Sequence, residues 1–408
     1  MLFTVATLSI ACGDDSSGTR TVRLTADGDV QTKVQQALIS AQEGDVLLFA
    51  KGTYMFSEEL SLSVSGVTLR GDGTREEVIL DFSRQQTGNA NGFSATGVHD
   101  LVIENFSLRD SVGDAVRVQG SENITLRNLK IYWTAGSATD NGAYGIYPVN
   151  DKKVLIDNCD VRGASDAGIY VGQSETAVVR NSHVEGNVTG IEIENTDDAE
   201  VTGNVARDNV SGILVFNLPN LRRKTGARTK VHGNTIEMNN REPFAIAGSI
   251  VSYVPPGSGM IMLANDNTEC HGNMIKNNAS VGIVVVSCGT VQFLTDNAIN
   301  CATDTVYDSF PEGLNIHDNT FAGNGTAPEG FYPVYWVDHS KPFYDIIWDG
   351  VTDPSKPNTD GSLNLCIQGN GSATFAHIDP AAPGTIVSTD LAPHACTHAA
   401  LPEVPVTW

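Results

Sequence analysis

Positively charged residues are scarce in this sequence. The 408-residue chain has 25 lysines and arginines against 48 aspartates and glutamates, for a net charge of -23. An acidic surface repels nucleic acid and other polyanions. We therefore expect no nucleic-acid partner, and an anionic ligand would need a local basic patch or a divalent cation.

Long hydrophobic runs are also lacking. The first eleven residues, "MLFTVATLSIA", are apolar but too short to span a bilayer, and they precede Cys12 and the polar run "GDDSSG". Small residues before a cysteine, followed by a polar tether, resemble a bacterial lipoprotein signal. The resemblance implies that residues 1–24 are signal and tether and that Cys12 is lipidated. The mature protein would then lie in the bacterial cell envelope or be secreted, with membrane contact only through the lipid. A frayed apolar N-terminus is the alternative.

Cysteines are few, and their spacing excludes common metal and haem sites. No CxxC pair is present, and "HACTH" lacks the CxxCH spacing of attached haem. Without Cys12, six cysteines remain, an even number that permits disulfides in an exported chain. We expect Cys366 to pair with Cys396. The sequence leaves open how Cys159, Cys270, Cys288 and Cys301 are connected.

Glycine and asparagine, in contrast, recur with a period. An asparagine follows an apolar strand at Asn105, Asn128, Asn158, Asn181, Asn204, Asn234, Asn273, Asn297 and Asn319, with gaps of 23, 30, 23, 23, 30, 39, 24 and 22 residues. A second register runs through Gly145, Gly168, Gly190, Gly212 and Gly282, each followed by isoleucine. A base period near 23 with insertions predicts the coils of an all-β solenoid. We expect the nine asparagines to stack at one corner.

Both ends of the repeat differ from its middle. Residues 30–43 place Val34, Leu38 and Ala41 on one helical stripe before the strand-like "GDVLLFAKGTY". This order resembles the N-terminal cap of pectate-lyase-like right-handed β-helices. The period is lost after about Asn324, and residues 326–408 are rich in tryptophan and proline. The sequence thus predicts a capped β-helix over residues 25–325 and an irregular C-terminal cap and tail over residues 326–408.

Three segments carry a wider family resemblance. "GAYGIYPV", "SDAGIYVGQS" and "GIEIEN" are similar to segments of bacterial exported or lipid-anchored proteins with tandem parallel β-helix repeats. The resemblance implies an all-β, right-handed parallel β-helix of the pectate-lyase-like superfamily. Because members tend to be encoded beside an exported c-type cytochrome-like protein, it also implies such a protein as a candidate partner. It does not imply an activity.

The known chemistry of this fold is incomplete here. The outline of residues 142–174 resembles the catalytic strands of alginate C-5 epimerases, which carry an aspartate and a histidine two residues apart. This chain has Tyr147 and Val149 at those positions, and Gln173 replaces the arginine of the next strand. The GHG and RIK elements of polygalacturonases are absent, and we interpret Asp197 and Asp198 in "NTDD" as a turn. A lyase-like or epimerase-like enzyme and a structural surface protein stay as alternatives.

One face of the second register nevertheless combines aromatic and charged residues. Strand alternation predicts that Arg117, Tyr147, Tyr170 and Glu192 point outward in one row, with Glu194 and Phe216 beside it. Stacked rings and carboxylates suit a sugar, and the carboxylates could bind its hydroxyls or a Ca²⁺ ion. We expect no other cofactor. We predict a surface for a polysaccharide or an exported protein partner, formed by Tyr144, Tyr147, Asp166, Tyr170, Gln173, Glu192, Glu194 and Phe216. The catalytic candidates are Arg117, Tyr147, Tyr170 and Glu192, and Tyr147 would act as a base if Arg117 lowered its pKa. Alternatively, tyrosine and glutamate occur there for packing reasons alone.

Two insertions are candidates for the walls of this face. Residues 132–141 contain Trp133 and Asp140. Residues 217–230 contain five cations, namely Arg222, Arg223, Lys224, Arg228 and Lys230. These cations could contact an anionic ligand or an acidic partner, or they could belong to a solvated loop.

Overall fold

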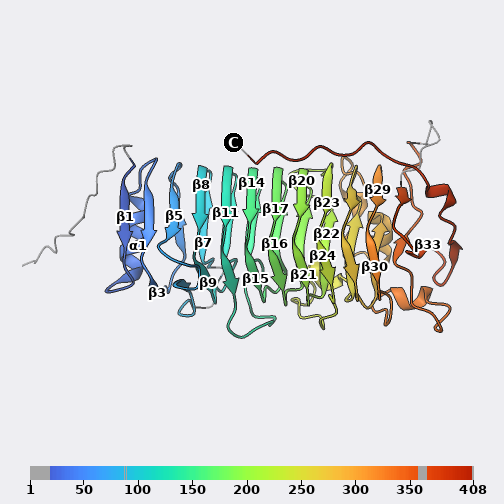
Figure 1. Ribbon diagram of the computed structural model, residues 1–408, viewed down its shortest axis with the longest axis horizontal. Coiled ribbons are helices and arrows are strands. Elements are labelled where there is room, and N and C mark those ends of the chain that lie inside the picture. Colours follow the sequence, from blue (N-terminus) through green and yellow to red (C-terminus); the bar gives the residue numbers. More distant parts are fainter. Residues whose placement is uncertain (1–18, 87, 89, 357–364, 407–408) are drawn as a thin grey trace, which may run out of the picture.

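The computed structural model describes residues 19–406 apart from 87, 89 and 357–364, and its strands form three sheets that run the length of the molecule (Figure 1). Coils in the middle of the molecule contribute one strand to each sheet, and neighbouring coils pair in parallel. Cys12 lies outside the described residues, so the expectation for it stays a prediction. Among the residues that the structure describes, no helix is both long and apolar enough to cross a membrane.

Sheet A holds, in order, β1 (Thr21–Leu24), β2 (Val46–Phe49), β5 (Thr68–Gly71), β8 (His99–Glu104), β11 (Glu122–Arg127), β14 (Lys152–Asp157), β17 (Glu175–Arg180), β20 (Asp197–Thr202), β23 (Thr229–His232), β26 (Glu269–His271), β29 (Leu314–His317) and β32 (Leu365–Gln368). Sheet B holds β3 (Gly52–Met55), β6 (Val78–Asp81), β9 (Ser107–Arg109), β12 (Lys130–Tyr132), β15 (Asp160–Arg162), β18 (His183–Glu185), β21 (Val205–Arg207), β24 (Thr235–Glu237), β27 (Met274–Lys276) and β30 (Thr320–Ala322).

Sheet C carries the second register of the sequence. It holds β4 (Leu60–Leu62), β7 (Phe93–Thr96), β10 (Val116–Gln119), β13 (Ile146–Val149), β16 (Ala167–Gly172), β19 (Thr189–Glu194), β22 (Ser211–Phe216), β25 (Ser258–Leu263), β28 (Val281–Val286), β31 (Ile346–Trp348), β33 (Phe375–Ile378) and the antiparallel β34 (Ile386–Ser388). The helices are α1 (Val30–Ile39), α2 (Cys288–Leu294) and the short η1 (Ile250–Tyr253), η2 (Cys301–Thr303), η3 (Tyr332–Tyr335) and η4 (Ala392–His394).

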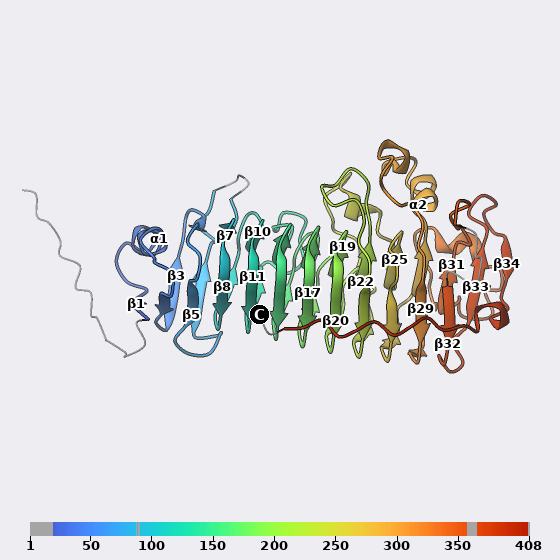
Figure 2. The ribbon, with the colours of Figure 1, turned by 90° about the horizontal axis from the view of Figure 1, so that it is seen from above.

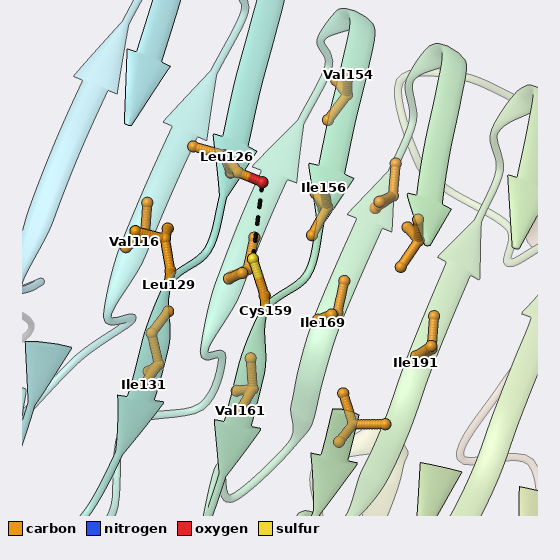
Figure 3. Close-up of a cluster of buried hydrophobic side chains, with 14 of the residues drawn as sticks. Val116, Leu126, Leu129, Ile131, Val154, Ile156, Cys159, Val161, Ile169 and Ile191 are labelled. Atoms are coloured by element: carbon orange, nitrogen blue, oxygen red, sulfur yellow. Dashed lines mark hydrogen bonds between the residues drawn. The ribbon is translucent and has the colours of Figure 1, made fainter. Parts of the chain in front are cut away.

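The core is a column of aliphatic side chains between the three sheets. Each strand alternates one inward and one outward residue, so the inward residues of successive coils stack. The isoleucines that follow the glycines of the second register, Ile146, Ile169, Ile191 and Ile213, are all fully buried in sheet C. Figure 3 shows Leu126, Val154, Ile156, Val161 and their neighbours packing toward this column, with the Cys159 thiol 3.7 Å from the Leu126 carbonyl oxygen.

The N-terminal end of the solenoid is closed by α1, as the sequence predicts. Asp29 accepts a hydrogen bond from the Thr32 amide and caps the helix, and Val34 and Leu38 are buried against the first coil. Gln35 donates to the Ser61 carbonyl oxygen over 3.0 Å. The helix thus covers an open end that would otherwise expose apolar side chains and unpaired strands.

The C-terminal expectation needs a correction. Strands β31, β32 and β33 extend sheets C and A beyond residue 326, so the solenoid continues where an irregular cap was expected. Long insertions between these strands hide the period in the sequence. After η4 the chain turns back and runs along sheet A toward β14 (Figure 1). Its backbone is held there by Glu269, which accepts from Leu401 N at 2.8 Å, and by Glu200, which accepts from Val404 N at 2.8 Å.

The predicted asparagine stack is two adjacent rows at one corner. Asn105, Asn128, Asn158 and Asn181 adopt left-handed backbone angles at the turn, and Asn128 donates to the Asn105 side-chain oxygen. The second row is buried and formed by Asn204, Asn234, Asn273, Asn319 and Asn370, each of whose side chains bonds the next. The side chains of the second row also bond backbone groups that the turns leave without a strand partner, such as the Val179 and Val201 carbonyl oxygens.

The predicted single row was wrong from Asn204 onward, where the asparagines belong to the second row, and at Asn297. His183 pairs with Val205, so Ser182 precedes Asn204 in its row, and Gly203 (φ 65°) takes the left-handed turn position that Asn181 holds one coil earlier. Asn297 belongs to neither row, because it follows α2 and bonds Gln292.

Two disulfides lie in the C-terminal third of the molecule. Cys366 of β32 is joined to Cys396, the pair expected from the sequence, and Cys288 of α2 is joined to Cys301 of η2. Cys159 and Cys270 are buried free thiols in the core. The first disulfide fastens the C-terminal segment to a coil strand, and the second closes the insertion between β28 and β29 on itself.

Candidate functional site

The outer face of sheet C carries the predicted row of aromatic and charged residues. The register sets Arg117 beside Tyr147, Tyr170 beside Glu192 and Glu192 beside Leu214. The same pairing sets Glu194 beside Phe216 in a second row. Successive coils therefore bring these residues side by side.

Arg117 and Tyr147 of this row are half-exposed, but the expectation that the row faces solvent was wrong for Tyr170 and Glu192. Tyr170 is only 3% exposed and Glu192 only 4% exposed, although both point away from the core. Tyr170 packs against Val149 and Ala167 and the rings of two other tyrosines. Insertions from later coils cover the face. The sequence shows their length but not that they fold over the strands.

Three tyrosine rings form the centre of the site. Tyr144 stacks on Tyr147 with ring centroids 4.4 Å apart, and Tyr170 lies 4.7 Å from Tyr147 and 5.0 Å from Tyr144. The Arg117 guanidinium carbon lies 5.0 Å from the Tyr147 ring centroid, a cation–π arrangement. Arg117 also pairs with Asp114 at 3.3 Å.

The structure corrects the proposed role of Tyr147 as a base. Burial raises the pKa of Tyr147 to about 12, and the nearby Arg117 lowers it less than burial raises it. A phenol with this pKa is protonated at neutral pH, so it donates a hydrogen bond but does not accept a proton.

Three carboxyl groups adjoin the tyrosines, and we call the set Tyr144, Tyr147, Asp166, Tyr170, Glu192 and Glu194 the tyrosine–carboxyl cluster. Burial raises the pKa of Glu194 to about 7 although the Tyr170 hydroxyl donates to it. Burial, with repulsion from Glu194 and Asp114, raises the pKa of Asp166 to about 7. Burial and the Asp166 charge also raise the pKa of Glu192, which accepts from Thr189 Oγ1 at 2.6 Å.

No lysine or arginine among the described residues forms an ion pair with these three carboxyl groups. Buried carboxyls without a cation are expensive for folding, so groups with strongly shifted pKa values mark candidate functional sites. Asp114, at the edge of the cluster, was missed by the sequence interpretation. Burial raises its pKa to about 6 against the influence of Arg117.

A cavity of about 410 Å³ opens beside the carboxyls. The cluster residues Tyr144, Asp166, Tyr170, Glu192 and Glu194 line one end, and apolar side chains of β22, β25 and β28 line the floor of the rest. Its roof comes from η1 and the residues after it, from α2 and residues 295–299, and from residues 330–332. Figure 2 shows α2 standing out from one side of the solenoid. Of the predicted residues, Phe216 belongs to the apolar part.

Gln173 lies apart from this cavity. It accepts from the Arg222 backbone N at 2.9 Å and lines a smaller hollow with Asp151 and Arg223. Of the two insertions, residues 132–141 turn Trp133 inward, where its indole donates to the Ser111 carbonyl oxygen, and leave Asp140 exposed.

The insertion at residues 217–230 is not a free basic patch. Four of its five cations contact acidic groups or the C-terminal segment, and Arg222 is exposed. Arg223 pairs with Asp197 at 2.5 Å, Lys224 with Asp304 at 2.7 Å and Arg228 with Asp198 at 2.6 Å, and Lys230 donates to the Leu401 carbonyl oxygen. Charge in this loop therefore fixes the loop and the tail to the coils.

A different set of carboxyls has the spacing of cation ligands. Asp266, Asp308 and Glu312 lie close enough to hold one metal ion. The Lys356 ammonium already lies 2.5 Å from Asp308 and 2.8 Å from Glu312. Lys356 thus offsets part of the negative charge of this group, and we assign the group no ligand.

Comparison with known proteins agrees with this architecture. The family model described as the right handed beta helix region matches residues 91–249. No curated protein matches the chain. The fold is a right-handed parallel β-helix.

Several solved structures are similar to the chain at low sequence identity. They include an alginate lyase from Paenibacillus sp. (18% identity, 62% of this chain and 94% of that one, TM-score 0.41). The A-module of the Azotobacter vinelandii mannuronan C-5 epimerase AlgE6 is 13% identical over 86% of this chain and 91% of that one, with a TM-score of 0.47. Pectate lyase Pel9A is 13% identical over 76% and 72%, with a TM-score of 0.45.

Proposed function

We propose that this β-helix protein binds a carbohydrate at the tyrosine–carboxyl cluster on the outer face of sheet C. The observation that carries the proposal is the packing of three tyrosine rings, 4.4–5.0 Å apart, beside the buried Glu192 and Glu194 and the half-buried Asp166. None of these carboxyl groups has a basic partner among the described residues. A fold held together by its strand ladders has no need of such a group.

The chemistry of the cluster suits a hydroxyl-rich ring. Aromatic side chains present apolar faces to the C–H surface of a sugar, and the phenols donate hydrogen bonds. A carboxyl with a pKa of about 7, as in Asp166 and Glu194, is partly protonated at neutral pH, so it both donates to and accepts from hydroxyls. The half-exposed Tyr147 and Arg117 give the ligand a path from solvent.

Acid–base catalysis on a neutral glycoside is the second candidate. A carboxyl that holds its proton near pH 7, such as Glu194, can protonate a leaving oxygen, and an ionised neighbour can act as base or nucleophile. A uronate is a poorer substrate, because its carboxylate would meet three carboxyls and only Arg117 as a cation. This argument disfavours the lyase-like and epimerase-like alternatives.

Export is a further part of the proposal, and the two disulfides support it. Disulfides persist outside the cytoplasm and are rare within it. We expect the mature chain to begin at a lipidated Cys12. Mass spectrometry of the exported protein is the test, and an unmodified Cys12 within an intact N-terminus would contradict the expectation.

Carbohydrate binding is tested with a glycan array, followed by calorimetry and product analysis on each glycan that binds. Tyr147→Ala should weaken binding roughly fivefold or more, because a stacking contact contributes about 1 kcal/mol. Tyr132→Ala on sheet B is the matched control, since Tyr132 is also half-exposed but lies on another face. Equal loss in both variants, or a folded protein that binds no glycan at all, would contradict the proposal.

A further inference from the structure

The outer face of sheet C changes character between β19 and β22. In one row Glu192 is followed by Leu214, Ile261 and Val284, and in the next row Glu194 is followed by Phe216, Leu263 and Val286. The face is thus polar through β19 and wholly apolar in these rows from β22 to β28. Because strands lie about 4.8 Å apart, the lined face from β16 to β28 extends about 19 Å.

The roof over the apolar part is fixed in place. The Cys288–Cys301 disulfide ties α2 to η2, and the buried Asp349 accepts from Ser287 N at 2.7 Å and from Thr290 Oγ1 at 2.6 Å. Val291, Leu294 and Ile299 reach the cavity from above. A cavity of about 410 Å³ with anchored walls has the size and apolar character of a preformed small-molecule site.

The roof also exposes apolar side chains at its edge. Ile250 is 53% exposed and Tyr253 is 43% exposed, yet both line the cavity, so they mark its entrance. Exposed apolar side chains at the mouth of a cavity mark an interaction site rather than ordinary surface.

We infer that the ligand is an amphiphile: a saccharide head lies at the tyrosine–carboxyl cluster, and an apolar chain or ring system attached to it fills the cavity between sheet C and the roof. The inference rests on the proposed function for the head group and adds the substrate class. A free polysaccharide has no group that matches walls of leucine, isoleucine and valine, because its hydroxyls would lose water without gaining partners there. Glu192 and Leu214 are direct neighbours in one row, so the polar and the apolar parts of the face adjoin. One ligand molecule can therefore contact both parts.

The test measures calorimetric binding of alkyl maltosides with six to ten chain carbons, each below its micelle-forming concentration, to the full chain. Affinity should rise roughly fourfold with each methylene, since each buried methylene contributes about 0.8 kcal/mol. Maltose, which lacks the chain, should bind at least 100-fold more weakly than decyl maltoside. Displacement of the neutral apolar dye N-phenyl-1-naphthylamine gives a second readout that needs no variant.

Two variants of α2 test where the alkyl chain of the ligand binds. Leu294→Trp fills the cavity from the roof without entering the solenoid core, and it should weaken decyl maltoside binding at least tenfold. Phe293→Trp is the matched control, because Phe293 adjoins Leu294 but is 59% exposed and does not line the cavity. The control should change affinity less than twofold.

The outcomes separate the two proposals. Affinity that is independent of chain length, with Leu294→Trp binding as tightly as the unmodified chain, would overturn the amphiphile and leave carbohydrate binding intact. Tight binding of decyltrimethylammonium with no binding of decyl maltoside would support the apolar cavity but contradict the saccharide head, and with it the proposed function.

Discussion

The outer faces of sheets A and C carry charges in opposite arrangements. On sheet A, Glu104 lies between Arg70 and Arg127, Asp157 pairs with Arg180, and His232 pairs with Glu200. On sheet C, three carboxyls adjoin one another and three tyrosines. The coil repeat aligns side chains into rows on both faces by the same geometry. The two faces therefore differ only in which residues are aligned. Paired rows strengthen the solenoid, whereas an unpaired row is retained at a cost to folding and points to a ligand.

The pKa values of two buried glutamates express this contrast. Burial acts to raise the pKa of Glu104, but hydrogen bonds and charge from Arg127 and Arg70 outweigh burial, and the pKa lies below its usual value. Burial raises the pKa of Glu194 to about 7, and no cation opposes it. The same residue type is therefore ionised on sheet A and half-protonated at neutral pH on sheet C.

The largest effect should come from the centre of the cluster. Tyr170→Ala removes a ring that is 3% exposed and leaves the Glu194 carboxyl without its phenol donor. We expect a loss of roughly 3 kcal/mol in the free energy of unfolding, as for other large-to-small changes at buried sites. Urea unfolding measures it. A loss below about 1 kcal/mol would mean that the roof does not close over this ring.

Glu194 should make the free energy of unfolding fall as the pH rises, which is the reverse of the usual effect of a glutamate. The folded-state pKa of Glu194 is about 7 and exceeds the unfolded value near 4.5, so its contribution favours folding below pH 4.5 and is lost as the pH rises toward 7. Between pH 5 and pH 8 the unmodified chain should therefore lose about 2 kcal/mol relative to Glu194→Gln. Parallel unfolding curves for the two proteins over this range would contradict the shift.

The same substitution on sheet A should have the smaller effect and the opposite sign. Glu104→Gln removes the carboxylate between two half-exposed arginines and should destabilise the fold by about 1 kcal/mol at pH 7, less at high salt. Denaturant titrations at low and high ionic strength check this. A stabilised variant would show that pairing on sheet A has no structural role.

The sequence predicted the solenoid because its signals are local and repeated. A glycine followed by isoleucine marks a strand of sheet C in each of five coils, and the amphipathic stripe of α1 marks the cap. The asparagine rows were misread where Gly203 took over the turn position of Asn181, since both residue types serve a left-handed turn.

The sequence predicted which residues of the site are neighbours but not that they are buried. Register alone brought Tyr147, Tyr170 and Glu192 together, because the coil spacing fixes neighbours on one face. Burial was not visible, since it depends on η1, α2 and η3 folding back over strands far away in the sequence. The pKa of Tyr147 is raised by its burial beside Tyr144 and Tyr170, which is why the expected base proved to be a hydrogen-bond donor.

The most direct measurement compares one substitution on the two faces. Glu192→Gln and Glu104→Gln each replace a carboxyl group with an amide and keep the side chain's size. Calorimetry with a glycan identified on the array reports their effect on binding. The account predicts that Glu192→Gln weakens binding at least tenfold while Glu104→Gln leaves it within twofold. Unchanged affinity in Glu192→Gln, or equal loss in both, would contradict the claim that the unpaired carboxyls of sheet C form the ligand site.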